Sequence, residues 1–331
     1  MPLGDSITFG LNVSGGYRTD LWQMIAADGF RADMVGSQFS GPARLGSKSH
    51  EGHGSFEIGQ IDALVQGWLS TYRPDVVLLH IGTNDVLHHK RPAAAARFSA
   101  LLSHITATLP RAEVFVATLI PLGDPQQESQ VQSLNTEIAQ IVQSRAAAGA
   151  RVQLVDMHAA LTRHDLSPDL IHPSASGYSK MAAQWYAALR GVPTTRWEAE
   201  DPQSTVVVKG RRMASATASG SGKVGFLISP GSYLEFHPTV ATSGPYQLYV
   251  RAANGMVTPC SQWLIVNGQR TGELHYPNLG FDRWTITAAE VPLNAGRNTV
   301  RLAHDLCNAE IDSVDLMPRA APIQLAGRTA F

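Results

Sequence analysis

A chain of 331 residues is longer than one hydrophobic core usually serves, so the sequence predicts two domains. With 44% hydrophobic residues, 16% charged residues and a formal net charge of -1, the composition is that of a globular protein and excludes both a disordered chain and the basic surface of a nucleic-acid-binding protein. The longest apolar runs, such as Val76 to Leu79, are far too short to cross a bilayer, so we expect no membrane span.

The start of the chain and its cysteines favour an exported protein. Met1 to Gly4 has neither the basic nor the apolar segment of a signal peptide, so we expect that an export signal was removed or never included. Cys260 and Cys307 are the two cysteines, and a pair confined to one region favours a single disulfide in a secreted domain. The alternative is two free thiols in a cytosolic protein.

Up to about residue 190, short apolar runs alternate with longer helical patterns. In one of these, Phe98, Leu101, Leu102 and Ile105 recur at steps of three and four residues, which is typical of one buried helical stripe. Strands that alternate with helices predict a parallel sheet covered on both faces. The predicted strands are 32–35, 75–81, 113–121 and 152–157, and the predicted helices are 17–27, 58–72, 93–109, 127–148 and 178–189.

After Gly191 to Pro193 the helical periodicity ends, and the boundary is expected near 191–197. Short strand-like segments separated by Gly, Pro, Asn and Ser turns predict a β-sandwich of roughly 120 residues. Asn267-Gly268 is a hairpin turn signal. The predicted strands are 206–208, 224–228, 233–236, 246–251, 263–266, 284–291, 298–303 and 311–316. The predicted domains are therefore 1–192 and 197–317, followed by a loose tail at 318–331.

Three motifs of the first domain point to nucleophilic chemistry. Gly4-Asp5-Ser6 follows a first strand, Gly82-Thr83-Asn84-Asp85 follows the most buried strand, and Asp169-Leu170-Ile171-His172 precedes the last helix. Serine needs a base, an orienting acid and donors for the oxyanion, and open α/β folds bring such groups to the carboxyl edge of the sheet. Each motif alone is an ordinary turn pattern. Their order along the chain favours a serine hydrolase.

That order resembles the SGNH/GDSL hydrolase superfamily over residues 1 to about 190. The resemblance implies a three-layer α/β/α, flavodoxin-like domain with Ser6 as nucleophile, His172 as general base and acid, and Asp169 as the residue that orients His172. It also implies that the Ser6 N–H and the Asn84 amide stabilise the oxyanion. Relatives add a glycine N–H from the loop before the second helix. Here we expect Ser55 at that glycine position and Gly54 one residue earlier.

Four further sequence motifs point to one branch of this superfamily. Pro2 to Thr8, Gly16-Tyr17-Arg18, Val35-Gly36-Ser37 and His50-Glu51-Gly52-His53 resemble the acetyl xylan esterase branch of the carbohydrate esterases. The rival G-x-S-x-G nucleophile elbow has no match in the sequence. The two histidines of His50 to His53 fall one residue short of the helical spacing of a zinc site, so a metal centre there is disfavoured. His88 and His89 are expected on a solvated loop near the mouth of the site.

In the second domain, acidic residues gather near both ends of the β-rich region. Glu198 and Glu200 stand two apart, so on one strand they would share a face, and like charges that close need a cation or exposure to solvent. A calcium site with oxygen ligands is one interpretation, and a charged edge strand is the other. For Trp263 and Trp284, at strand positions, core packing is favoured over contact with a sugar.

The opening Trp197 to Glu200, the segment Ala295 to Val300 and the segment Ile311 to Val314 resemble the calcium-binding jelly-roll carbohydrate-binding modules. This resemblance implies a structural calcium held by Glu198, Glu200 and Asp312, with Asp315 as the alternative aspartate. It also implies a sugar site in the end loops at Phe281 and Asn308, because aromatic rings stack on the C–H faces of sugars.

The sequence therefore predicts a secreted serine esterase that removes acetyl groups from a plant polysaccharide, with acetylated xylan as the expected substrate. No cofactor is expected in the chemistry, and calcium is expected only as a structural ion. We expect a monomer without nucleic-acid or membrane partners. Two alternatives stay open: a lipid, aryl-ester or thioester hydrolase on the same fold, and a carbohydrate-binding protein without catalytic activity.

Overall fold

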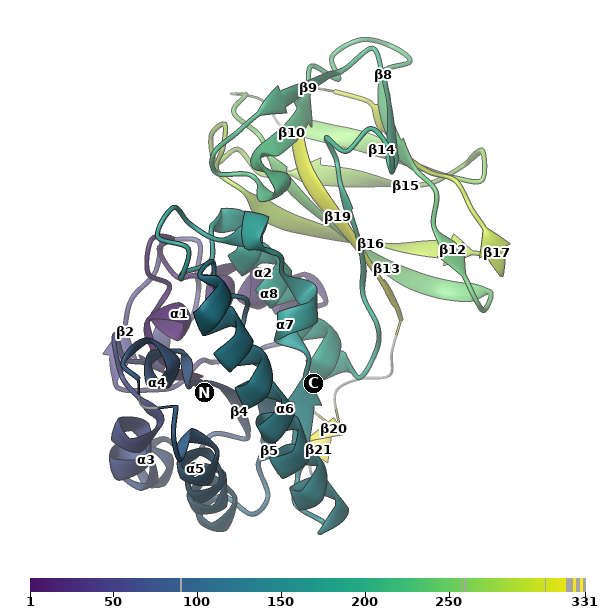
Figure 1. Cartoon of the computed structure of the whole chain (residues 1–331). Coiled ribbons are helices and arrows are strands. Elements are labelled where there is room, and N and C mark those ends of the chain that lie inside the picture. The colour runs from purple at the N-terminus through teal and green to yellow at the C-terminus, as the bar shows by residue number, and fades with distance from the viewer. Residues whose placement is uncertain are drawn as a thin grey trace. The chain divides into compact units, whose positions relative to one another are not determined.

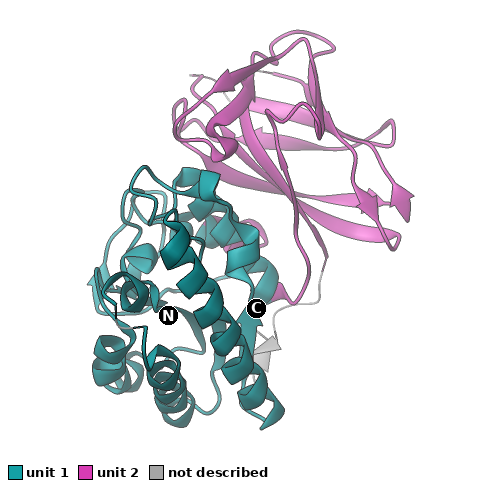
Figure 2. Ribbon diagram, in the orientation of Figure 1, with its two compact units in different colours: residues 1–22, 30–189, 322–331 teal, residues 23–29, 190–321 magenta. Residues whose placement is uncertain are grey.

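The computed structural model describes residues 1–89, 91–256, 258, 260–306 and 308–319, together with the backbone of 324–325 and 328–329. The chain divides into two compact units (Figure 2). The first holds residues 1–22, 30–189 and 322–331, and the second holds 23–29 and 190–321. The second unit resumes at residue 190, and the change of pattern was expected near 191–197. That residues 23–29 belong to the second unit was not predicted.

A six-stranded sheet forms the centre of the first unit, with the strand order β2-β3-β1-β4-β5-β6. Its strands pair in parallel, except that β2 runs antiparallel to β3. The strand bounds are Pro2–Gly4 for β1, Gln38–Phe39 for β2, Ser49–Gly52 for β3, Val76–His80 for β4, Glu113–Ala117 for β5 and Val152–Val155 for β6.

Helices cover this sheet (Figure 1). The helix bounds are Ser6–Phe9 for α1, Tyr17–Ala27 for α2, Ile58–Tyr72 for α3, Thr83–Leu87 for α4, Ala94–Thr108 for α5, Pro125–Ala147 for α6, Met157–Ala160 for α7 and Ala175–Arg190 for α8. Apolar side chains of α3, α5 and α6 form one core with alternate residues of the strands, including Leu3, Leu79 and Val116. Tyr17 of α2 packs against Trp185 of α8, with ring centroids 6.0 Å apart. The predicted α/β class is confirmed.

The strand expected at 32–35 is wrong, because those residues have no regular structure. The strand beside β1 is instead β3, which the apolar pattern could not reveal. Its residues His50 and Glu51 are fully buried, and their polar atoms form hydrogen bonds instead of being replaced by apolar side chains: His50 bonds to Ser40, and Glu51 accepts from Ser37.

The second unit is an antiparallel sandwich of two sheets. The first sheet has the order β16-β13-β19-β10-β9, with β7 also paired to β19, and the second has the order β15-β14-β18-β11-β8. A separate apolar core lies within this unit and includes Leu234, Phe236, Leu248 and Leu302. The strand bounds are Thr195–Glu198 for β7, Thr205–Val208 for β8, Arg211–Ala214 for β9, Gly222–Gly225 for β10, Tyr233–Phe236 for β11, Gly244–Ala253 for β13, Cys260–Val266 for β14, Gln269–Tyr276 for β15, Thr285–Leu293 for β16, Val300–His304 for β18 and Glu310–Pro318 for β19, beside the short pair Thr239–Val240 (β12) and Gly296–Arg297 (β17).

The sandwich was expected, but β7, β9, β12, β15 and β17 are not among the predicted strands. The hairpin turn at Asn267-Gly268 is present, with φ of 50° and 82°, and it joins β14 to β15. Strand β15 escaped the pattern because charged residues and Gly272 interrupt it. Strand β7 ends at Glu198, so Glu200 lies in the following turn and does not share a strand face with it, contrary to our expectation.

Other expectations concern the cysteines, the end of the chain and membranes. Cys260 is disulfide-bonded, whereas Cys307 lies outside the described residues. The expected loose tail at 318–331 also falls largely outside them, although Pro318 ends β19 and Gln324–Leu325 pairs with Arg328–Thr329. Within the part of the chain that the structure describes, none of the helices has the length and apolar character needed to cross a membrane.

Candidate active site

Ser6 begins helix α1 directly after the central strand β1. Asp5 caps this helix, since its Oδ1 accepts a hydrogen bond from the Ile7 N–H at 2.9 Å. Gly4 must be a glycine, because a Cβ atom there would lie 2.0 Å from the carbonyl oxygen of His80 on the neighbouring strand. The strand-to-helix turn therefore carries Ser6 to the carboxyl edge of the sheet, as the sequence predicted.

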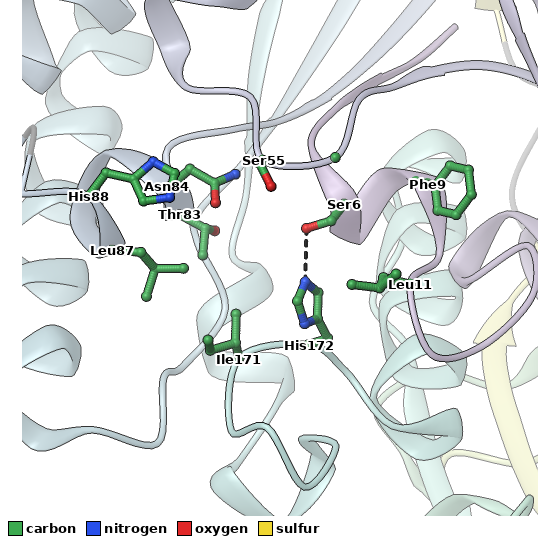
Figure 3. Close-up of a pocket in the computed structure, with 11 residues that line it drawn as sticks. Ser6, Phe9, Leu11, Ser55, Thr83, Asn84, Leu87, His88, Ile171 and His172 are labelled. Carbon is green, nitrogen blue, oxygen red and sulfur yellow. Dashed lines mark hydrogen bonds between the residues drawn. The ribbon is translucent and has the colours of Figure 1, made fainter.

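The structure brings the three residues of the predicted triad together. Ser6 Oγ lies 2.9 Å from His172 Nε2 (Figure 3), and His172 Nδ1 lies 2.8 Å from Asp169 Oδ2. Both distances are within hydrogen-bonding range. This is the nucleophile–base–acid arrangement that activates a serine for attack on a carbonyl carbon.

Asp169 is held in its ionised form. Its Oδ1 accepts from the backbone N–H groups of Ile171 and His172, at 3.0 and 2.9 Å, and its Oδ2 accepts from Asn12 Nδ2 at 2.8 Å. Partial burial by itself would raise the pKa of Asp169, but the hydrogen bonds from His172, Ile171 and Asn12 outweigh it and lower the pKa to about 2. A permanently charged acid beside Nδ1 fixes the His172 tautomer that leaves Nε2 free to accept a proton from Ser6. Sequence reasoning did not identify Asn12.

Asn84 is on α4, which begins directly after Gly82, whose φ of 127° favours glycine. The Nδ2 atom of Asn84 donates to the carbonyl oxygen of Phe56 at 2.9 Å. An amide nitrogen carries two N–H donors, so one remains available to face the cavity. Figure 3 shows the amide on the same side of the cavity as Ser55.

Gly54 and Ser55 both line the cavity, in the loop between β3 and α3. Ser55 has a φ of 64°, in the left-handed region that glycine adopts most easily. This conformation supports our alignment of Ser55 with the glycine of related enzymes. That the main-chain N–H of Gly54 or of Ser55 stabilises the oxyanion stays a prediction.

The site opens into a cavity of about 480 Å³, which is within the usual size range of small-molecule sites. Its lining contains the predicted Ser6, Gly54, Ser55, Asn84 and His172 together with Phe9, Leu11, Thr83, Leu87, His88 and Ile171. His88 was expected near the mouth of the site. The apolar lining residues Phe9, Leu11 and Leu87 were missed, because lone apolar residues on short helices and loops give no periodic signal.

His50 and His53 do not meet at a metal site. His50 Nε2 lies 2.7 Å from Ser40 Oγ, and His53 Nε2 lies 2.7 Å from Glu51 Oε2. Burial, together with the nearby Arg18 and His53, lowers the pKa of His50 to about 3, so the His50 ring is neutral. The disfavoured zinc interpretation finds no support here.

In the second unit, Glu198, Glu200 and Asp312 surround the turn at Ser219 and Gly220. Ser219 donates its N–H to Asp312 Oδ1 at 2.6 Å and its hydroxyl to Glu198, and a Cβ atom on Gly220 would lie 2.1 Å from Glu200 Oε1. Asp312 also forms a buried ion pair with Arg251. In the described ranges, no group of three or more His, Cys, Asp or Glu side chains is arranged to hold a metal ion.

The carboxyl group of Glu200 is crowded by other acidic groups. Its Oε2 is buried and makes no hydrogen bond among the described residues. Burial, followed by the charges of Glu198 and Asp312, raises the pKa of Glu200 to about 7. Asp315, the alternative ligand, is less suited because Arg196 donates to both of its oxygens, at 2.8 and 2.6 Å.

The predicted sugar-binding residues lie on loops of the sandwich. The Phe281 side chain is 47% exposed and its ring lies over Gly255, where a Cβ atom would be 2.3 Å from the ring. Asn308 Oδ1 is buried without a hydrogen-bond partner in the described part of the chain. Trp284 is 2% exposed, as expected for core packing, whereas Trp263 is half-buried with the Arg270 guanidinium stacked on its ring.

Comparisons with known proteins identify the family of the first unit. Residues 3–180 match the model of the GDSL-like Lipase/Acylhydrolase family. A multidomain esterase of Ruminococcus flavefaciens is 27% identical over 218 residues, which is 58% of this chain but 28% of that protein. The chain thus spans about a quarter of the length of this relative.

Solved structures that resemble parts of this chain include two esterases and a carbohydrate-binding module. A family 3 carbohydrate esterase of Clostridium thermocellum is 39% identical, with a TM-score of 0.52, over 56% of this chain and 92% of that one. A mutant of an acetyl esterase, solved with an acetate ion, is 28% identical, with a TM-score of 0.51, over 57% of this chain and 94% of that one. A family 35 carbohydrate-binding module of Clostridium thermocellum is 28% identical, with a TM-score of 0.34, over 38% of this chain and 98% of that one.

Proposed function

Because the chain belongs to the GDSL-like lipase/acylhydrolase family and is a carboxylic ester hydrolase, we propose that it removes acetyl groups from a plant polysaccharide, namely acetylated xylan. The observation that carries this proposal is the hydrogen-bonded series Ser6–His172–Asp169 at the edge of a cavity lined by Asn84 and Ser55. The similarity to a carbohydrate esterase and to an acetyl esterase supports the sugar ester and the small acyl group.

In the proposed mechanism, Ser6 Oγ attacks the acetyl carbonyl carbon while His172 Nε2 takes its proton. Negative charge then develops on the carbonyl oxygen, where the Ser6 N–H, the main chain at Gly54 or Ser55, and the Asn84 amide donate hydrogen bonds. His172 then gives the proton to the departing sugar oxygen, which leaves as a hydroxyl as the ester bond breaks, and the acetyl group stays on Ser6. In the second half, His172 takes a proton from a water molecule whose oxygen attacks the acetyl carbon, acetate leaves, and the proton returns to Ser6 Oγ.

The test is a panel that measures acetate release from acetylated xylan and from other acetylated polysaccharides, beside nitrophenyl esters of increasing acyl length. We expect acetate release from xylan, a steep fall beyond short acyl chains, and no turnover in Ser6→Ala. A preference for long acyl chains or thioesters would instead favour the lipid or thioester alternative. Retained turnover in Ser6→Ala would refute the serine mechanism.

We propose further that the second unit binds the polymer and holds a structural calcium ion. The calcium ligands would be Glu198, Glu200 and Asp312, and the crowded, buried carboxyl group of Glu200 supports this proposal. The sugar site would lie at Phe281 and Asn308: the exposed ring of Phe281 suits stacking on a sugar, and Asn308 Oδ1 has no hydrogen-bond partner among the described residues. An exported enzyme would fit both the disulfide at Cys260 and a cell-wall substrate.

Polymer binding is tested by depletion of the protein from solution with insoluble acetylated xylan. Phe281→Ala should reduce the bound fraction and should leave kcat on nitrophenyl acetate within about twofold, because binding to a remote part of the polymer does not alter the chemical step. Equal binding by Phe281→Ala and the unmodified chain would remove Phe281 from the sugar site.

A further inference from the structure

Glu51 is a fully buried carboxylate that has no part in the proposed chemistry, yet it lies three residues before Gly54. A buried carboxylate is strongly unfavourable unless hydrogen bonds surround it. Here the N–H and the hydroxyl of Ser37 lie at 2.5 and 2.9 Å, and His53 Nε2 lies at 2.7 Å. Glu51 is therefore fixed in place from two directions, and one of them is His53.

His53 is immobilised by its ring and by its main chain. The ring stacks between Trp68 and Phe56, with centroids at 4.7 and 4.9 Å and interplanar angles of 6° and 21°. Its N–H donates to the Gly4 carbonyl oxygen at 2.9 Å, and its own carbonyl oxygen accepts from the Phe56 N–H at 3.2 Å. His53 thus connects the strand that carries the nucleophile to the loop that follows.

The loop itself has little else to hold it in shape. Gly54 and Ser55 are exposed, and a Cβ atom on Gly54 would meet no atom within 4 Å. Ser55 is in a left-handed conformation, which is unfavourable by roughly 1–2 kcal/mol for a residue other than glycine. Beyond the loop, the Phe56 carbonyl oxygen accepts from Asn84, so the loop and the second oxyanion donor are connected.

Oxyanion donors contribute to catalysis because they are already in position when charge develops. If the loop that carries them moves, most of this stabilisation of the transition state is lost. We infer that Glu51 and His53 form a positioning pair, which holds the Gly54–Ser55 turn and, through Phe56, the Asn84 amide in the geometry that stabilises the oxyanion. The role rests on the proposed function of the site. It gives the His50-Glu51-Gly52-His53 motif a purpose other than metal binding.

The test compares two variants of the pair with a matched control in the full chain. His53→Phe keeps an aromatic ring in the stack but removes the hydrogen bond to Glu51, and Glu51→Gln keeps the shape but removes the charge. The control is His104→Phe, which breaks a more exposed histidine–carboxylate bond of 2.6 Å between His104 and Asp62 on helices α5 and α3, neither of which lines the cavity. The readouts are kcat and KM on nitrophenyl acetate, the melting temperature, and inhibition by a boronic acid that forms a tetrahedral adduct on serine.

We expect kcat to fall about 10- to 100-fold in His53→Phe and less in Glu51→Gln, with KM within about twofold, because only a transition-state interaction is weakened. Boronic acid inhibition should weaken by a similar factor, and His104→Phe should leave both measurements near those of the unmodified chain. Unchanged kcat in folded His53→Phe, or the same fall in His104→Phe, would overturn the inference.

Should His53→Phe fail to fold, the kcat of Glu51→Gln decides in the same way, and an unchanged value would overturn the inference. Ser6→Ala is measured in parallel to separate the two levels of the argument. Activity retained by Ser6→Ala refutes the proposed mechanism, whereas an inactive Ser6→Ala beside a fully active His53→Phe refutes the positioning role alone.

Discussion

Asp169 of the first unit and Glu200 of the second are both acidic side chains with proposed roles, but their surroundings shift their pKa values in opposite directions. Donors from His172, Ile171 and Asn12 lower the pKa of Asp169 to about 2 despite partial burial. Burial, with Glu198 and Asp312 nearby, raises that of Glu200 to about 7. The negative charge of a carboxylate that is surrounded by donors is already stabilised, whereas a carboxylate crowded by other carboxylates needs a proton or a cation.

Replacing the carboxylate by the amide of the same shape should therefore change kcat greatly at Asp169 and hardly at all at Glu200. Asp169→Asn should lower kcat by about 10⁴-fold, because an amide cannot hold the His172 tautomer that accepts the Ser6 proton. Glu200→Gln should leave kcat within about twofold. Steady-state kinetics on nitrophenyl acetate measure both. A loss below tenfold in Asp169→Asn would show that Asp169 is not the orienting acid.

Asn84→Ala removes one donor from the oxyanion site while leaving the triad intact. We expect kcat to fall about 100- to 1000-fold, with little change in KM, because the lost hydrogen bond acts mainly in the transition state. The melting temperature is the control, since Asn84 also bonds to the Phe56 carbonyl oxygen. A fall in kcat below about fivefold in a folded protein would remove Asn84 from the oxyanion site.

How far these roles could be read from the sequence depends on the kind of signal. Ser6, Asn84, Asp169 and His172 were predicted because three motifs, each weak alone, follow one another in an order that favours a serine hydrolase and resembles the SGNH/GDSL superfamily. Asn12 was missed because a single asparagine in a loop carries no pattern. Strand β3 was missed because its burial is achieved by polar residues, so its apolar content gives no indication of its place beside β1.

For the carboxylates of the second unit, the sequence indicated residues that do lie close together, but for a structural reason that was wrong. The proximity of Glu198 and Glu200 was inferred from a strand alternation that does not exist, since β7 ends at Glu198. Both carboxylates nevertheless lie beside the turn at Gly220, and Asp312, which the resemblance alone implied, lies beside Ser219 in the same turn. Sequence could also not reveal that Arg251 pairs with Asp312 and Arg196 with Asp315, because those contacts join distant strands.

The effects of chelator and of pH on the melting temperature test the proposal for Glu200. The pKa of Glu200 in the fold, about 7, is higher than its ordinary value of 4.5, so its stabilising effect is complete below pH 4.5 and is lost as the pH rises through 7. With chelator, the melting temperature of the second unit should therefore fall between about pH 5 and pH 7.5.

Calcium should restore the melting temperature at the upper end of that range, because a ligand of the folded state stabilises it by mass action. Glu200→Gln should flatten the pH dependence and weaken the response to calcium. Differential scanning calorimetry measures both. If the melting temperature of the unmodified chain does not change with chelator at pH 7.5, the calcium proposal is wrong.

The smallest effect is expected at Ser55, where side chain and main chain can be separated. Ser55→Gly suits the φ of 64°, so it removes an unfavourable conformation of roughly 1–2 kcal/mol, partly offset by about 0.5–1 kcal/mol from the extra freedom of glycine in the unfolded chain. Since we expect the main-chain N–H to be the donor, kcat should stay within about threefold and the melting temperature should rise slightly. Ser55→Val, a β-branched residue that resists positive φ, should distort the turn and lower kcat by about tenfold. A tenfold loss in Ser55→Gly as well, in a protein at least as stable as the unmodified chain, would assign the oxyanion contact to the Ser55 hydroxyl instead.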